Sequence, residues 1–208
     1  MSSLADLVLH LDQHLVEWMA LWGPWIYLLM FLVIFCETGL VVAPFLPGDS
    51  LLFALGALSV AENGLDLTTL LLVLSLAGIL GDSLNYQIGR YLGPRVFERD
   101  SPFFRREYLL KTEQFYEKWG GFTIIAARFA PIVRTFAPFV AGVGRMPWRR
   151  FLGYNAIGGV VWVFTFVLAG HFFGNLPVVK AHFHLVIIAV IVFSVLPLVM
   201  PWLRTRRT

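Results

Sequence analysis

The chain has 208 residues, of which 58% are hydrophobic and only 14% are charged. Soluble globular domains carry about 25% charged residues, so this composition and a mean hydropathy of +0.76 exclude a soluble domain and predict one integral membrane domain over residues 1–208. The net charge of +3 is small and the basic residues flank apolar segments, which excludes nucleic-acid binding through a basic patch.

The first segment, residues 4–19, places apolar side chains at helical spacing opposite a polar face. This pattern predicts an amphipathic interfacial helix, with a frayed terminus as the alternative. The first 17 residues contain no Lys or Arg, so we expect no signal peptide. The single cysteine, Cys36, rules out an intrachain disulfide and a Cys-based zinc site.

Residues 20–61 predict a re-entrant hairpin. The run from Trp18 to Cys36 holds 19 residues without a charge, close to the about 20 that a span needs. Helix-breaking and charged residues then interrupt it: Glu37, Gly39, Pro44, Pro47, Gly48 and Asp49. Asp49 or Ser50 can cap the next helix, Ser50–Ala61. With 12 residues, that helix is too short to cross a bilayer alone.

Residues 67–89 predict a full membrane span, with small residues that permit close helix contact. Four secondary site candidates lie in its far half and just beyond it: Asp82, Asn85, Tyr86 and Arg90. Asp82 is a candidate buried acid; the alternative is that Asp82 and Asn85 simply lie near the membrane interface. Residues 90–119 form the long polar segment, and we expect it to rest on the cytoplasmic surface.

Residues 120–147 predict a second re-entrant hairpin, because two crossings need about 40 residues and only 28 are available. Arg128 and Arg134 lie inside this apolar run, and Pro131 and Pro138 interrupt it. Irregular backbone at membrane depth is tolerated only where protein buries it or where it lines a cavity. Two further spans are predicted at residues 151–175 and 185–203.

The distribution of basic residues predicts the orientation. If each hairpin returns to its own side, one face receives 13 of the 16 Lys and Arg residues, and the positive-inside rule makes that face cytoplasmic. The 90–119 segment and the C-terminus then lie inside and the N-terminus lies outside. Two full crossings in place of either hairpin preserve this orientation, so both options stay open. The two hairpin-plus-span units enter from opposite faces, as in inverted-repeat transporters.

The two breaks carry four ionisable residues in apolar surroundings: Glu37, Asp49, Arg128 and Arg134. A charged side chain in the bilayer core costs about 2.5–3.5 kcal/mol on insertion scales, so we expect the arginines to pair with the acids. A phosphate offers several oxygens for bidentate bonds to arginine. We therefore predict that a lipid phosphate displaces the acids and that an acid then takes up a proton. The alternative is a structural cluster that only fixes the hairpins.

At these residues the chain resembles the DedA family, also described as SNARE-associated or VTT-domain membrane proteins. The matching motifs span residues 20–175 and include Glu37-x-Gly39, Pro44-x-x-Pro47-Gly48-Asp49, Gly78-x-x-Gly81-Asp82 and Arg128-Phe-x-Pro131-x-x-Arg134-x-x-x-Pro138. The resemblance implies lipid transport, in bacterial members of undecaprenyl phosphate or of phospholipids such as phosphatidylethanolamine. It maps the family's functional acids and arginines onto Glu37, Asp49, Arg128 and Arg134.

The expected function is therefore an all-α transporter of an anionic lipid such as undecaprenyl phosphate in the bacterial inner membrane, coupled to the proton motive force. Alternatives are a phosphatidylethanolamine or general phospholipid transporter or scramblase, and an ion-coupled small-solute antiporter. An enzyme is not expected, because no Lys–Arg–His phosphatase pattern is present, and a non-catalytic scaffold is a further rival. Expected partners are the lipid and the bilayer, with a homo-oligomer left open; no cofactor or metal is expected. We expect His171 to be a satisfied packing residue.

Overall fold

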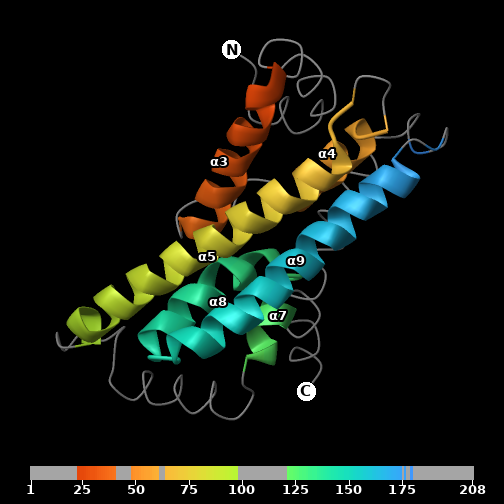
Figure 1. Cartoon of the computed structure of the whole chain (residues 1–208). Coiled ribbons are helices and arrows are strands. Elements are labelled where there is room, and N and C mark those ends of the chain that lie inside the picture. The colour runs from red at the N-terminus through yellow and green to blue at the C-terminus, as the bar shows by residue number, and fades with distance from the viewer. Residues whose placement is uncertain are drawn as a thin grey trace, which may run out of the picture. The chain divides into compact units, whose positions relative to one another are not determined.

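The computed structural model describes residues 23–40, 48–60, 64–97 and 121–174, with Leu176 and Val179. Every regular element in these ranges is helical (Figure 1), which confirms the all-α class. The elements are η1 (Gly23–Trp25), α3 (Ile26–Gly39), α4 (Gly48–Leu58), α5 (Leu67–Phe97), α7 (Phe122–Ala127), α8 (Pro131–Val143) and α9 (Trp148–Phe173). The predicted helix at 4–19, the predicted span at 185–203, residues 98–119, Pro44 and Pro47 lie outside the described residues.

Within the described ranges, two helices are long and apolar enough to span a bilayer: α5, over Leu67–Leu92, and α9. They match the spans predicted at 67–89 and 151–175. The remaining α-helices have 14, 11, 6 and 13 residues, shorter than the about 20 that a span needs. A re-entrant hairpin consists of two short helices on either side of a break, and these helix lengths fit that arrangement. The re-entrant path stays a prediction, with two full crossings as its alternative.

Helices α4 and α5 differ from their predicted bounds. Helix α4 ends at Leu58 and not at the predicted Ala61. Helix α4 begins at Gly48, so Asp49 and Ser50 lie inside its first turn and do not cap it. An acid in that position is still favourable, because the N-terminal end of a helix carries partial positive charge. Helix α5 runs past the predicted end at Gly89 to Phe97. Gly89 does not stop the helix; a Cβ there would overlap the backbone carbonyl of Phe139 in α8, so this glycine permits a close helix contact.

The chain divides into two compact units. Among the described residues, unit 1 comprises η1 with α3 up to Val33, α4, α5 up to Leu74, and α9 from Val161. Unit 2 comprises residues 34–40, α5 from Ser75, α7, α8, and α9 up to Val160.

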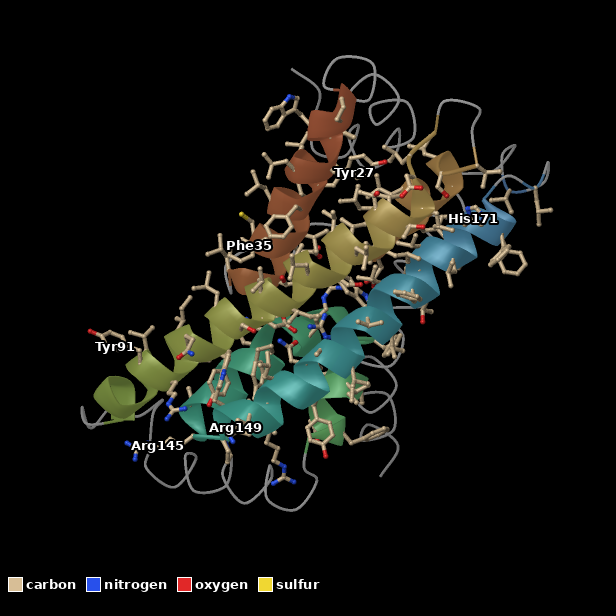
Figure 2. The ribbon with its side chains drawn as sticks, in the orientation of Figure 1. Tyr27, Phe35, Tyr91, Arg145, Arg149 and His171 are labelled. Carbon is tan, nitrogen blue, oxygen red and sulfur yellow. The ribbon has the colours of Figure 1, made fainter. Side chains whose placement is uncertain are left out.

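Unit 1 is built on a close contact between α4 and α9. A Cβ at Gly56 would overlap the carbonyl oxygen of Val167, and a Cβ at Gly170 would overlap that of Phe53. The two backbones can approach only because both positions lack a side chain. At the start of α5, the Asp66 amide donates a hydrogen bond to the Tyr27 hydroxyl at 2.7 Å, which ties α5 to α3. Figure 2 shows Tyr27 on α3 and His171 near the end of α9.

Unit 2 has a small-residue and aromatic core. Tyr86 stacks on Phe151 with ring centroids 4.3 Å apart, and its hydroxyl donates to the carbonyl of Met146. A Cβ at Gly142 of α8 would overlap the Tyr86 carbonyl oxygen, so α8 packs directly on the backbone of α5. This packing places the residues of the α7–α8 break against the middle of α5.

Candidate functional site

The break between α7 and α8 follows from proline. Pro131 occupies the first turn of α8, where its missing N–H costs nothing, and the preceding Ala130 is extended with φ −125°. Helix α7 ends at Ala127, so Arg128 lies in the turn between the helices and Arg134 lies one turn into α8. The backbone amide of Arg134 donates to the carbonyl of Ala130 at 2.8 Å. Pro138 lies inside α8.

One ion pair joins an arginine and an acid of the predicted set. Arg134 Nη2 lies 2.5 Å from Glu37 Oε1, and the two residues are only 5% and 3% exposed. Glu37 comes from the last turn of α3, so the pair joins the two elements that the sequence predicted to carry opposite charges. The pair is charge-assisted and nearly dry, which makes it costly to break on one side alone.

The second arginine has a different ion-pair partner from the one expected. Arg128 Nη2 lies 2.5 Å from Asp82 Oδ2 and 2.5 Å from Asn155 Oδ1, and Arg128 and Asp82 are each 1% exposed. We expected Asp49 to complete the second pair; the ion pair that the structure shows for Arg128 is with Asp82. Asp82 is therefore a buried member of the cluster.

Glycines on α9 leave room for the Arg128 side chain. A Cβ at Gly158 would lie 3.1 Å from Arg128 Cδ, and one at Gly159 would lie 3.4 Å from Arg128 Nη2. Asn155, on the same helix, accepts from Arg128 and donates to the Ile79 carbonyl at 3.0 Å. Helix α9 therefore supplies both a space and an acceptor for the guanidinium group.

Asn85 connects the broken elements of unit 2. Its amide nitrogen donates to the carbonyl of Thr135 in α8 at 2.8 Å and to the carbonyl of Thr38 in α3 at 3.3 Å. Asn85 is fully buried. The same helix, α5, thus carries the carboxylate that binds Arg128 and the amide that holds the backbones on which Glu37 and Arg134 lie.

Tyr86 and Arg90, the other two secondary candidates, form a separate network. Arg90 Nη1 donates to the Tyr86 hydroxyl at 3.2 Å, and that hydroxyl donates to the Met146 carbonyl. Figure 2 shows Arg145 and Arg149 beside the turn between α8 and α9. These contacts stabilise the basic end of unit 2, whereas the ion pairs involve Glu37, Asp82, Arg128 and Arg134.

Asp49 belongs to unit 1. Its Oδ1 accepts a hydrogen bond from the Trp162 indole nitrogen at 2.9 Å, and both residues are buried. Gly48 begins α4 beside it, as the prediction of a helix start at this position requires. In the same unit, Ser59 Oγ lies 2.7 Å from His171 Nδ1, which confirms the interpretation of His171 as a satisfied packing residue.

Sequence reasoning gave no role to Asn155, Thr38, Thr135 or Trp162. A polar residue in an apolar span is itself a signal, because polar side chains in membranes usually face the protein interior. Asn155, between Phe151 and Gly158, fits that description. The carbonyl groups of Thr38 and Thr135 carry no such signal, since every residue has one. No group of three or more His, Cys, Asp or Glu side chains in the described ranges is arranged to hold a metal ion.

The comparisons with known proteins agree with this architecture. Residues 46–172 match the VTT domain. The chain is 53% identical over 206 residues to Protein DedA of Escherichia coli strain K12, which covers 98% of this chain and 94% of that protein. It is 43% identical over 178 residues to an uncharacterized membrane protein of Mycobacterium tuberculosis strain H37Rv, covering 85% and 78% of the two chains. It is 34% identical over 187 residues to the inner membrane protein YghB of E. coli K12, covering 88% and 84%. No solved structure shows significant similarity to the chain.

Proposed function

Since this chain belongs to the VTT-domain family of DedA-like inner membrane proteins, we propose that it transports an anionic lipid such as undecaprenyl phosphate across the membrane, coupled to protons. The observation that carries the proposal is the pair of buried arginines. Arg128 and Arg134 are both nearly inaccessible, each forms an ion pair with a buried carboxylate, and both belong to unit 2.

The arrangement suits exchange of one anion for another. Both ion pairs take their arginine from the α7–α8 segment of unit 2, so we treat them as one cluster. One phosphate has enough acceptor oxygens to bind two guanidinium groups at once. In the two ion pairs, each carboxylate binds one arginine. In this mechanism the headgroup enters the cluster, takes the donors of Arg128 and Arg134, and releases the carboxylates. A released carboxylate then takes up a proton, because an unpaired buried charge is costly.

Phosphatidylethanolamine, or phospholipids in general, is the second candidate substrate class. The cluster holds carboxylates as well as arginines, so a zwitterionic headgroup would place its phosphate on the arginines and its ammonium on Glu37 or Asp82. An ion-coupled small-solute antiporter could use the same charges. The proposal assigns no catalytic step, cofactor or metal ion to the protein.

Transport in liposomes tests the proposal. The purified full chain is reconstituted with labelled polyprenyl phosphate, with and without a pH gradient, and compared with Arg128→Gln and Arg134→Gln. Arg149→Gln is the matched control, because Arg149 is an exposed arginine of unit 2. We expect wild type and the control to transport and both buried-arginine variants to lose at least tenfold in rate, which corresponds to about 1.4 kcal/mol.

The competing substrates are separated in the same vesicles. Phosphatidylethanolamine movement without polyprenyl phosphate movement would favour the second substrate class. Movement of neither lipid, together with arginine-dependent flux of a small anion, would favour the antiporter. Unchanged lipid transport in both folded arginine variants would reduce the cluster to a structural role.

The proposed topology places residues 90–119 and the C-terminus in the cytoplasm, the N-terminus outside, and both hairpins as re-entrant. A cysteine at Phe136, which is 44% exposed in α8, probes the second hairpin in a Cys36→Ser background. A membrane-impermeant thiol reagent should label it from the cytoplasmic side only. Ready labelling from the outside would show that the segment crosses the membrane.

A further inference from the structure

Asp82 and Asn85 on α5 each hold a buried acceptor oxygen to which no described residue donates. Asp82 uses Oδ2 to bind Arg128, but its Oδ1 accepts no hydrogen bond from any described residue. Asn85 Oδ1 is likewise inaccessible and without a donor in the described part of the chain. Asp82 is 1% exposed and Asn85 is 0% exposed. A buried acceptor left unsatisfied costs about 1–3 kcal/mol, so two on one helix face call for an explanation.

The orientation of the Asn85 amide is determined by its neighbours. Its nitrogen faces two carbonyl oxygens, those of Thr38 and Thr135, and only an N–H group can satisfy them. Turning the amide over would place its oxygen against two other acceptors. Asn85 Oδ1 is therefore an acceptor that needs a hydrogen from elsewhere.

The two unsatisfied atoms belong to neighbouring side chains. Asp82 and Asn85 are three residues apart in a continuous helix, so they share one face and their Cβ atoms lie about 5–6 Å apart. Side chains three residues apart on one helix face can hydrogen-bond directly. One added proton on the Asp82 carboxyl group would give it an O–H donor, which Asn85 Oδ1 can accept.

The charges around Asp82 favour its protonation only after an anion has replaced it as the partner of Arg128. The charges that act on Asp82 are those of Arg128 and Arg134, from the α7–α8 segment; Glu37 of α3 pairs with Arg134, and α9 contributes the uncharged Asn155. While Arg128 binds Asp82, the carboxylate is neutralised by the arginine. Once an anion takes Arg128, the carboxylate loses its counter-charge in a dry site, where the neutral acid is favoured.

We propose that Asp82 is the residue that carries the transported proton, and that its protonated Oδ1 donates a hydrogen bond to Asn85 Oδ1 while lipid phosphate occupies Arg128. This proposal rests on the proposed lipid transport. The proton comes from water and binds the carboxylate, and no other bond forms or breaks except hydrogen bonds. A monoanionic phosphate and one proton enter together, so the net charge of the cluster stays unchanged.

Asn85 would link protonation of Asp82 to the hydrogen bonds that hold α3 and α8. Its amide already holds the backbones of α3 and α8, which carry Glu37 and Arg134. A new hydrogen bond to its oxygen polarises the amide and strengthens the two bonds from its nitrogen, because connected hydrogen bonds reinforce one another. Proton uptake at Asp82 would thus tighten the contacts around the bound headgroup.

Infrared difference spectroscopy tests the assignment without relying on transport. The C=O stretch of a protonated carboxylic acid is absent from a carboxylate, so addition of polyprenyl phosphate to the purified full chain should produce this band. We expect the band in wild type and in Asp66→Asn, which changes an exposed carboxylate at the start of the same helix. It should be absent in Asp82→Asn. In Asn85→Leu it should move to higher frequency, because its hydrogen-bond acceptor is gone.

Isotope labelling keeps the test valid if Asp82→Asn does not fold. Wild-type protein made with carboxyl-labelled aspartate should show the band at a shifted frequency, whereas labelled glutamate should leave it unmoved. A band that follows the glutamate label, that survives in folded Asp82→Asn, or that never forms on lipid addition would overturn the assignment. Wild-type lipid transport in liposomes is measured on the same preparation, so transport without the band refutes only this assignment, and absence of transport refutes the proposed function.

Discussion

The two compact units hold their buried carboxylates by different chemistry. In unit 1, Asp49 accepts from the neutral indole of Trp162 at 2.9 Å. In unit 2, Glu37 and Asp82 are paired with arginines at 2.5 Å. The indole donor is neutral, whereas each guanidinium group of unit 2 carries a positive charge to which an anion can bind. Under the proposed function, the lipid phosphate exchanges with the carboxylates of unit 2.

The backbone contacts of the two units are built alike. Gly56 lets α4 approach the backbone of α9 in unit 1, and Gly142 lets α8 approach the backbone of α5 in unit 2. Close helix packing at small residues is therefore common to both units, as is usual for helices in membranes. The difference between the units lies in their buried charges.

The largest effect is expected from removing one partner of a charge pair in unit 2. Arg134→Leu leaves Glu37 buried without this arginine, which costs about 3–5 kcal/mol. The double variant Arg134→Leu with Glu37→Leu should recover much of that loss, since no charge is then stranded. Unfolding in detergent, followed by circular dichroism, measures the stability of the single and the double variant, with exposed Arg149→Leu as the control. If Arg134→Leu is as stable as the control, the buried ion pair does not distinguish unit 2 from unit 1.

A smaller effect is expected in unit 1. Trp162→Phe keeps most of the buried ring but removes the hydrogen bond to Asp49, and hydrogen bonds to charged groups contribute about 1.5–3 kcal/mol. Trp148→Phe, whose ring packs against Tyr86 and Phe151, serves as the matched control. The same unfolding measurement applies. If Trp162→Phe destabilises the protein as strongly as Arg134→Leu, the two units do not differ in the way described.

Replacing a contact glycine by alanine should destabilise the two units by similar amounts. Gly56→Ala and Gly142→Ala each force a methyl group against a backbone carbonyl, and overpacking costs about 1–3 kcal/mol. Gly153→Ala is the control, because a Cβ there meets nothing within 4 Å. In a helix interior this control should stabilise by up to about 1 kcal/mol. Thermal unfolding of the three variants measures these effects. Unequal losses in Gly56→Ala and Gly142→Ala would show that the two units do not share this kind of helix packing.

The smallest effect is expected at an exposed carboxylate outside both membrane-spanning helices. Asp66 accepts from the backbone amide of Thr69 at 2.6 Å, and hydrogen bonds from Thr69 hold the pKa of Asp66 below its ordinary value of 3.8. Because the folded pKa is the lower one, its stabilisation is present above pH 3.8 and is lost as the pH falls through the folded pKa. Asp66→Asn retains a capping side chain and should abolish only this pH dependence. A melting temperature that depends on pH equally in both proteins would contradict the assignment.

Part of the site was predictable because charges in apolar segments are conspicuous. Arg128, Arg134 and Glu37 stood out for this reason, and two of them, Arg134 and Glu37, form an ion pair. The ion-pair partner of Arg128 could not be predicted from the sequence. Asp82 and Asp49 were both candidate acids, and nothing in their spacing along the chain shows which of them faces Arg128. Asn155 is recognisable as a polar residue in an apolar span, but nothing in the sequence shows that it accepts from Arg128. Trp162 looks like an ordinary helix residue until its neighbours are known.

The amino-acid sequence by itself determined that this is an all-α membrane protein, and it determined where the helices break, because composition and proline act locally along the chain. It also showed that the charges in apolar segments need partners, since the bilayer penalises each of them. Only the tertiary structure decided that Arg128 pairs with Asp82, that Asn85 holds both α3 and α8, and that Asp49 receives an indole hydrogen bond. These contacts depend on how α5 and α9 are rotated about their axes, and that rotation is decided by glycine contacts and ring packing between segments far apart in the sequence.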